Sequence, residues 1–258
     1  MQPPRSILIT GASSGLGAAL AVHYAGNGVT LHLQGRNAVR LDAVAAECRA
    51  RGTAVHIQTL DVTDAKAMED WLLAADALAP IDLLIANAGI SAGTGDKGES
   101  AQQVRRIFAT NIDGVINSVQ PLLAAMMARR SGQIAVMSSL ASIMPLPSCP
   151  AYSASKACVR YYGEALRGWL GRHGVKVNVI CPGYIRTPMT AVNRFPMPFI
   201  MNADKAAAII AGGLAKNRGR IAFPLGLYVP LWLLSCITPR LTGPLFSLMP
   251  SKRDIPSP

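Results

Sequence analysis

The amino-acid sequence predicts an α/β protein built on one parallel sheet that helices cover on both faces. Short apolar runs alternate with alanine-rich stretches suited to helices, and the runs are apolar throughout rather than at every second residue. Strands buried on both faces have this appearance, because crossover helices cover each side of a parallel sheet. With 258 residues, 50% of them hydrophobic and 15% charged, the chain has enough apolar material for one sizeable core.

Strands and helices are expected to alternate along the chain. The expected strands are 6–10, 29–34, 54–59, 81–86, 133–138 and 175–181. The expected helices are 18–26, 39–50, 64–77, 104–129 and 152–172. Arg51 and Gly52 end the second helix, and Thr63 with Asp64 supplies the N-cap of the third. Parallel sheets bind ligands at the carboxyl ends of their strands, so functional residues are expected in the loops that follow the strands.

The loop after the first strand has the spacing TGxxxGxG, from Thr10 to Gly17. Glycine permits a tight turn and a close approach of a ligand to the backbone. The N-terminus of the following helix offers unpaired N–H groups and the positive end of its dipole to a phosphate. Because the loop lies between a strand and a helix, it favours a nucleotide site over a purely structural turn. Its predicted cofactor contacts are Gly11, Ser13, Ser14, Gly15, Leu16 and Gly17.

The end of the second strand bears on which nicotinamide cofactor binds. A dinucleotide-binding fold that prefers NAD has an acidic residue there, which accepts hydrogen bonds from the ribose hydroxyls. Here the loop is Gln34-Gly35-Arg36-Asn37, which has an arginine and no carboxylate. Because a guanidinium suits a 2′-phosphate, Arg36 favours NADP(H) over NAD(H); the alternative is an ordinary surface arginine.

Tyr152 and Lys156 are spaced i and i+4, on one face of a predicted helix and about 6 Å apart along its axis. An ammonium close to a phenol favours the phenolate, so a lowered pKa is expected for Tyr152. Such a tyrosine can donate a proton to a carbonyl that accepts a hydride. A YxxxK pattern is also common on exposed helix faces, and it becomes informative only together with the other motifs.

Taken together, the motifs resemble the short-chain dehydrogenase/reductase family over residues 5–190. They stand in the family's order: TGxxxGxG at 10–17, Asp61, Asn87-Ala88-Gly89, Asn111, Ser138-Ser139, Tyr152 with Lys156, and the run from Pro182 to Thr187. The resemblance implies that residues 1–258 form a single doubly wound, Rossmann-type domain. It also implies a seven-stranded parallel sheet, whose last strand is expected near 220–223.

The resemblance further implies catalytic roles for four residues. Tyr152 resembles the general acid/base, and Lys156 the residue that lowers its pKa and holds the nicotinamide ribose. Ser139 resembles the hydroxyl that polarises the substrate carbonyl, whereas Ser138 is expected to pack at the end of its strand. Asn111 resembles the residue that anchors a proton-relay water through a local distortion of its helix.

Other cofactor contacts are implied beyond the glycine loop. Asp61 and Val62 resemble the contacts at the adenine edge, and the segment Asn87, Ala88 and Gly89 resembles the one beside the adenosine ribose. The contacts around the nicotinamide carboxamide, which fix the face that transfers hydride, are Ile185 and Thr187 with Pro182 and Gly183 beside them. Relatives that prefer NADP often carry Arg or Lys in the glycine loop, where this chain has serines, so Arg36 is expected to carry most of the charge facing a 2′-phosphate.

Residues 188–205 are expected to form the lid over the substrate, because the family varies there. The run MTAVNRFPMPFIM within it is rich in methionine. Adaptable apolar surface of this kind suits a hydrophobic substrate, and simple packing onto the core is the alternative.

Residues 221–250 form an apolar C-terminal extension, in which 221–239 carry no charge. This length approaches that of a membrane span, but Pro224 and Pro230 argue against a regular spanning helix. Two expectations remain open: the extension packs in a subunit interface, or it lies on a membrane surface where nearby basic residues meet lipid phosphates.

The net charge of +11 is unevenly distributed. Residues 1–128 carry 9 Lys/Arg and 11 Asp/Glu, giving −2, and residues 129–258 carry 16 and 3, giving +13. The basic half can face cofactor phosphates, anionic lipid or nucleic acid, or be a solvated surface. Aromatics make up only 5% and no Lys/Arg run exceeds two residues, which argues against nucleic acid.

Five cysteines and four histidines are scattered along the chain and form no ligand pattern. They fit neither a disulfide framework nor a zinc cluster, so no metal is expected and a reducing compartment is the simpler interpretation. No segment near Met1 resembles a signal peptide. A cytoplasmic location is therefore expected, with association at a membrane periphery left open.

The sequence thus predicts an NADPH-dependent carbonyl reductase, or in reverse an alcohol dehydrogenase, for a ketone or aldehyde that is lipophilic. A homo-oligomer, dimer or tetramer, and no nucleic-acid partner are expected. A non-catalytic nucleotide-sensing or scaffold protein is one alternative, which the complete set Ser139, Tyr152 and Lys156 argues against. A sugar-nucleotide epimerase or dehydratase is another, although that class usually has a longer chain with a separate substrate domain.

Overall fold

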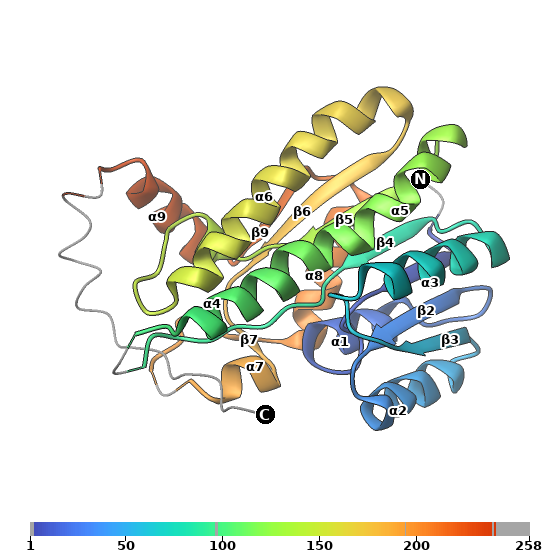
Figure 1. Cartoon of the computed structure of the whole chain (residues 1–258), viewed down its shortest axis with the longest axis horizontal. Helices are drawn as coiled ribbons and strands as arrows, with labels where there is room; N and C mark the ends of the chain where they lie inside the picture. Colours follow the sequence, from blue (N-terminus) through green and yellow to red (C-terminus); the bar gives the residue numbers. More distant parts are fainter. Residues whose placement is uncertain (1–2, 96–97, 194, 239, 241–258) are drawn as a thin grey trace.

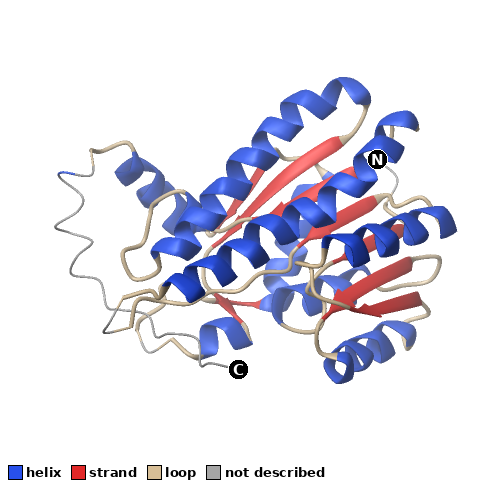
Figure 2. Cartoon of the chain, viewed as in Figure 1, coloured by secondary structure: helices blue, strands red, loops and turns tan. Residues whose placement is uncertain are grey.

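The structure, a computed structural model, describes residues 3–95, 98–193, 195–238 and 240. Its centre is a parallel sheet of seven strands in the order β3-β2-β1-β4-β5-β6-β9. The strands are Ser6–Ile9 (β1), Thr30–Gly35 (β2), Ala54–Thr59 (β3), Leu83–Ala86 (β4), Gln133–Met137 (β5), Lys176–Pro182 (β6) and Arg220–Phe223 (β9). The chain winds outward from β1 in one direction and from β4 in the other, so the predicted doubly wound α/β fold is confirmed (Figure 2).

Helices cover both faces of the sheet, as the continuous apolar strands predict. The helices are Gly15–Tyr24 (α1), Ala38–Arg49 (α2), Ala65–Leu78 (α3), Ala101–Phe108 (α4), Gly114–Ala128 (α5), Pro150–Leu170 (α6), Pro188–Ala191 (α7), Ala203–Ala215 (α8) and Leu225–Ser235 (α9). One apolar core lies between the sheet and α1, α2 and α8. A second core lies between the opposite face and α3, α5 and α6, which lie in front of the strands in Figure 1.

The predicted helix 104–129 is divided, because five residues form a π-helical turn between α4 and α5. This turn spans Ala109–Asp113 and contains Asn111, so the expected local distortion is present. The first helix also differs from its prediction, since it begins at Gly15 rather than at residue 18. α4 begins three residues before the predicted start at 104. The other boundaries differ by two residues at most, and the seventh strand lies where it was expected, at Arg220–Phe223.

Two features of the C-terminal third were not predicted. Residues Ile185–Arg186 (β7) and Met201–Asn202 (β8) pair as a separate two-stranded parallel sheet. Leu225–Ser235 forms α9 although Pro230 lies inside it. In the part of the chain that the structure describes, the helices are too short or too polar to cross a bilayer. Residues 241–250 of the predicted extension lie outside the described residues.

Because His32 on β2 is buried, we expect the free energy of unfolding to fall in acid. Its side chain is 1% exposed, it stacks on His56 with ring centroids 5.1 Å apart, and burial lowers the pKa of His32 to about 4. The unfolded chain therefore binds a proton that the fold excludes, and about 2 to 3 kcal/mol of stability is lost as pH falls from 6.5 towards 4. We expect His32→Gln to reduce this loss, measured by urea unfolding at several pH values. Exposed His23→Gln is the control, and an equal pH dependence in both variants would contradict the account.

Candidate active site

A cavity of about 610 Å³ runs along the carboxyl ends of β1, β4, β5 and β6. The glycine loop forms one end of it, and residues of α9 form the other. The predicted site residues that line it are Gly11, Ser13, Ser14, Gly15, Leu16, Gly17, Arg36, Val62, Asn87, Ala88, Gly89, Ser139, Tyr152, Lys156, Pro182, Gly183, Ile185 and Thr187. Asp61 is outside this lining and pairs with Arg36, and Asn111 is fully buried beside Gly89. The fold therefore brings motifs from six loops and from helix α6 to one cavity.

The glycine loop is packed so tightly that side chains are excluded from two of its positions. Gly11 has φ +67°, and a Cβ on Gly17 would overlap the carbonyl oxygen of Gly11. The Asn87 amide donates to the carbonyls of Thr10 and Gly11 at 2.9 and 3.2 Å, which ties β4 to the loop. The loop thus presents backbone at the N-terminus of α1, an arrangement that fits a pyrophosphate.

We expect Gly17→Ala to weaken nicotinamide cofactor binding by at least about 10-fold, because the added methyl group forces the loop away from the helix N-terminus. The measurement is a fluorescence titration with NADPH, with circular dichroism to establish that the variant is folded. Gly26→Ala is a matched control, since a Cβ at Gly26 meets nothing within 4 Å. Unchanged affinity in Gly17→Ala would show that the loop does not hold the cofactor.

Arg36 stands at the cavity rim with a second arginine that the sequence prediction missed. Arg36 Nη1 lies 3.3 Å from Asp61 Oδ2, and both Arg36 and Arg40 line the cavity. Burial raises the pKa of Asp61, but hydrogen bonds from Thr63 and the Arg36 guanidinium outweigh burial and leave this pKa below its usual value. Asp61 is therefore ionised and orients Arg36. Arg40 could have been found from its position one helical turn after Arg36.

Ser139, Tyr152 and Lys156 meet in the middle of the cavity. Ser139 follows β5, and its hydroxyl is hydrogen-bonded to that of Tyr152 on α6. Lys156 Nζ lies 5.9 Å from the centre of the Tyr152 ring and donates to the Met137 carbonyl at 2.9 Å. The i, i+4 prediction is therefore correct in placing the phenol and the ammonium on one face of the helix.

The prediction of a lowered pKa for Tyr152 is wrong for this structure. Burial raises the pKa of Tyr152 to about 12, and the hydrogen bond from Ser139 offsets only part of that effect. Burial also lowers the pKa of Lys156 to about 8. The physical reason is that the ammonium points to the Met137 carbonyl, while Lys156 is buried and Tyr152 is half-buried. Tyr152 thus carries its proton at neutral pH.

Asn111 and Ser138 form hydrogen bonds that connect α6, which carries Tyr152 and Lys156, to its neighbouring elements. Asn111 is fully buried in the π-helical turn, where it accepts from the Ile90 N–H at 2.8 Å and donates to Ser155 Oγ at 2.9 Å. Ser138 donates to the Lys156 carbonyl at 2.8 Å. Ser138 is 2% exposed and packs at the end of its strand as expected; both serines border the cavity, and Ser139 is the one hydrogen-bonded to Tyr152.

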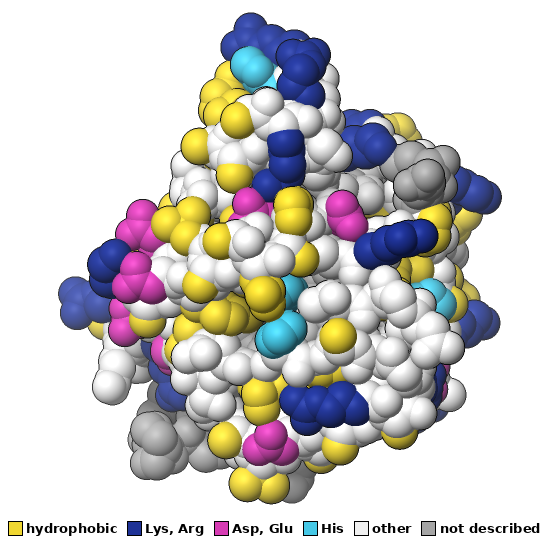
Figure 3. Space-filling model, turned by 90° about the vertical axis from the view of Figure 1, so that its right-hand side faces the viewer, with side chains coloured by type: hydrophobic (Ala, Val, Ile, Leu, Met, Phe, Trp, Pro, Cys, Tyr) yellow, Lys and Arg dark blue, Asp and Glu magenta, His cyan; other side chains and the backbone are white. Residues whose placement is uncertain are grey.

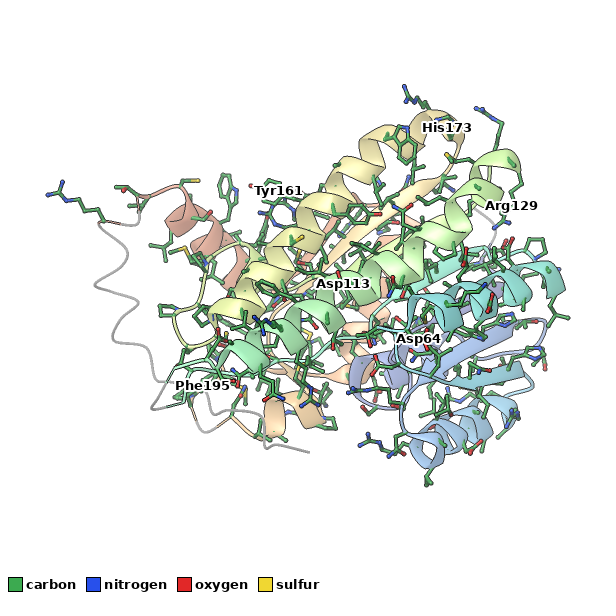
Figure 4. All side chains as sticks on the ribbon, in the orientation of Figure 1. Asp64, Asp113, Arg129, Tyr161, His173 and Phe195 are labelled. Carbon is green, nitrogen blue, oxygen red and sulfur yellow. The ribbon has the colours of Figure 1, made fainter. Side chains whose placement is uncertain are left out.

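The end of the cavity away from the glycine loop is lined mainly by apolar side chains that belong to none of the sequence motifs. Those from the turn after β5 and from the segment after β7 are Leu140, Ala141, Leu146, Cys149, Met189, Phe195, Pro196 and Pro198. Figure 4 shows Phe195 at the end of the molecule away from Arg129 and His173, and its ring packs edge-on against Tyr184. Leu227 and Leu231 of α9 complete the lining, and their i, i+4 spacing in the apolar extension is the signal that could have revealed them.

Lysines and arginines on the face opposite α9 are scattered among neutral side chains rather than gathered in one patch (Figure 3).

The chain is similar to known oxidoreductases over most of its length. The family model described as short chain dehydrogenase matches residues 5–196. An uncharacterized oxidoreductase of Myxococcus xanthus is 39% identical over 88% of this chain and 90% of its own, and one of Mycobacterium tuberculosis is 34% identical over 92% and 96%. The structure of a short-chain dehydrogenase from Sphingobium yanoikuyae in complex with NADPH superposes with a TM-score of 0.80, at 27% identity over 97% of this chain and 98% of that chain. The chain therefore belongs to the short-chain dehydrogenase family and is an NAD(P)-dependent oxidoreductase of alcohol and ketone groups.

Proposed function

We propose that the protein is an NADPH-dependent carbonyl reductase that converts a lipophilic ketone or aldehyde to its alcohol, and catalyses the reverse reaction. The observation that carries the proposal is the group Ser139, Tyr152 and Lys156, which lies between the glycine loop and an apolar cavity end. A proton donor is needed where a carbonyl oxygen gains negative charge, and this group supplies one.

In this reaction Tyr152 gives its phenolic proton to the carbonyl oxygen of the substrate. The hydroxyl of Ser139, already hydrogen-bonded to Tyr152, turns to donate to the same oxygen and polarises the C=O bond. NADPH, when bound, supplies the hydride that reaches the carbonyl carbon. With a pKa of about 8, Lys156 is mainly an ammonium at neutral pH, and it stabilises the phenolate that proton transfer leaves on Tyr152. Asn111, in its distorted helical turn, is assigned the role of anchoring the water that relays a proton back to Tyr152.

The preference for NADPH over NADH rests on Arg36 and Arg40 at the cavity rim. β2 ends in Gly35, where a preference for NAD would favour a carboxylate, and a Cβ on Gly35 would lie 2.8 Å from the Ser13 side chain. Two guanidinium groups suit a 2′-phosphate, which a carboxylate would repel. That the Sphingobium yanoikuyae relative was solved with NADPH supports the same assignment.

The lipophilic substrate class rests on the apolar end of the cavity. Residues 188–205 are assigned the lid, because Met189, Phe195 and Pro198 contribute to the lining there. Apolar side chains bind apolar substrate surface, and methionine adapts to different shapes. A homo-oligomer is part of the proposal, since the family commonly forms one.

The proposal is tested by following NADPH absorbance with detergent-dispersed methyl ketones of increasing chain length, with NADH in parallel. We expect a rate that rises with chain length and requires NADPH, because each buried CH2 group contributes about 0.8 kcal/mol of binding. A flat or falling series would contradict the lipophilic substrate. Equal rates with NADH would contradict the cofactor assignment.

A further inference from the structure

We propose that the outer face of α9 binds the surface of an anionic lipid bilayer while its inner face lines the substrate cavity, so that substrate reaches the site from the membrane. The route of entry rests on the proposed lipophilic substrate. The lipid contact itself does not, and it is tested without any measurement of activity.

The side chains of α9 divide into two apolar faces. Leu227, Tyr228 and Leu231 are half-buried and pack against Leu140 and other core residues. The side chains on the other face are exposed although all are large and apolar: Leu225, Val229, Trp232 and Leu233. Their spacing i, i+4, i+7 and i+8 places them on one stripe of the helix. An ordinary surface helix has a polar stripe in that position.

The exposed stripe continues onto the lid. The ring of Phe199 is 60% exposed and would lie 3.3 Å from a Cβ on Gly226, so it adjoins the start of α9. Ile237, just beyond the helix, is also exposed. Large exposed apolar patches mark sites of protein or membrane contact. This one, defined by residues 199, 225, 229, 232, 233 and 237, is called the α9 patch.

The α9 helix is held firmly to the domain rather than loosely attached. Arg220 on β9 donates to the hydroxyl of Tyr228 at 3.2 Å and to Glu164 on α6 at 2.7 Å. Arg160 also pairs with Glu164, at 3.4 Å. This network fixes which face of α9 points outward, and it neutralises the carboxylate nearest to the helix. The α9 patch is therefore a rigid surface.

Charge selects an anionic bilayer as the partner. Residues 225–258 carry three Lys/Arg and one Asp/Glu, and the exposed Arg240 follows the end of α9 by five residues. Basic residues beside an apolar surface are attracted to acidic lipid headgroups, at about 1 kcal/mol each near the membrane. Trp232 adds a side chain that favours the boundary between headgroups and acyl chains.

The α9 patch and part of the cavity lining lie on two faces of the same helix. Leu227 and Leu231 line the cavity, and Val229 and Trp232 face outward between and beyond them. In Figure 1, α9 stands at the end of the molecule farthest from α2. Contact of the α9 patch with a bilayer therefore brings the lid segment and the apolar cavity end to the lipid surface.

The experiment uses the full chain and vesicles of phosphatidylcholine, with and without phosphatidylglycerol. Two reporters each keep one tryptophan: Trp71→Phe/Trp169→Phe leaves Trp232, and Trp71→Phe/Trp232→Phe leaves Trp169. Vesicles with brominated acyl chains quench a tryptophan that enters the bilayer. We expect quenching of Trp232, stronger with phosphatidylglycerol, and none of Trp169, which is exposed on α6.

Co-sedimentation of Val229→Gln/Leu233→Gln with the same vesicles gives the second readout. We expect binding to fall by at least about 10-fold, because two apolar side chains leave the interface. Val39→Gln/Leu78→Gln removes exposed apolar side chains of α2 and α3, and it should bind like the wild type. Absence of Trp232 quenching on anionic vesicles would overturn the proposal. A second outcome would also overturn it: the wild type does not bind vesicles, and Val229→Gln/Leu233→Gln changes the oligomeric mass measured by light scattering. The α9 patch would then be a subunit interface.

Discussion

Tyr152→Phe is expected to lower the turnover number by about 10²- to 10⁴-fold, the range that a positioned proton donor contributes. The substitution removes the phenolic hydroxyl that Ser139 contacts and leaves the ring, so the cavity keeps its shape. Binding of NADPH should change by no more than about twofold, because it depends on the glycine loop and the arginines at the rim. Steady-state kinetics and a fluorescence titration with NADPH measure the two quantities.

Tyr161→Phe is the matched control for this variant. Tyr161 lies on the same helix, α6, but is 66% exposed and does not line the cavity. Its replacement should leave turnover unchanged. If Tyr152→Phe retained wild-type turnover, the proton donor would have to be another group and the proposed chemistry would be wrong.

Arg36→Leu is expected to raise the KM for NADPH by about 10- to 100-fold, since a hydrogen bond to a charged group contributes roughly 1.5 to 3 kcal/mol. The KM for NADH should change little, because NADH has no 2′-phosphate. Loss of the pair with Asp61 should cost the fold less than about 1 kcal/mol, as both side chains are substantially exposed. Initial rates at varied NADPH and NADH give the two constants.

Arg105→Leu on α4 controls for the loss of one positive charge, because Arg105 is exposed and lies outside the cavity lining. A similar rise in KM for both cofactors in Arg36→Leu would indicate a general disturbance of the loop after β2. Arg36 would then not be the residue that selects NADPH, and Arg40 would be the remaining candidate at the cavity rim.

The fold was predictable because, in the first two thirds of the chain, the apolar pattern of each segment agrees with the parallel sheet that the segments form together. Continuous apolar runs such as Leu83–Ala86 can be buried on both faces only in a parallel sheet. The motif residues were predictable for a related reason. Strand ends converge at one edge of the sheet, so Gly11, Asn87 and Ser139 meet although they are far apart in the sequence.

The substrate end of the site was not predictable in the same way. Leu227 lines the cavity through packing of α9 against the turn after β5, a long-range contact that leaves no local pattern. Pro224 and Pro230 argued only against a regular spanning helix, and the shorter helix α9, which contains Pro230, was not predicted. The pKa of Tyr152 depends on where the Lys156 ammonium points and on burial, and neither follows from an i, i+4 spacing.

The most direct test of the proposed reaction follows deuterium from NADPH to the product. The full-length protein is incubated with a long-chain methyl ketone and NADPH deuterated at C4, using each of the two C4-labelled stereoisomers in turn. We expect the alcohol to carry one deuterium on its carbinol carbon with one stereoisomer and none with the other. The reason is the proposed role of Ile185 and Thr187, which line the cavity, in holding the nicotinamide in one orientation. Alcohol that carries no deuterium from either stereoisomer would contradict hydride transfer from NADPH to the carbonyl.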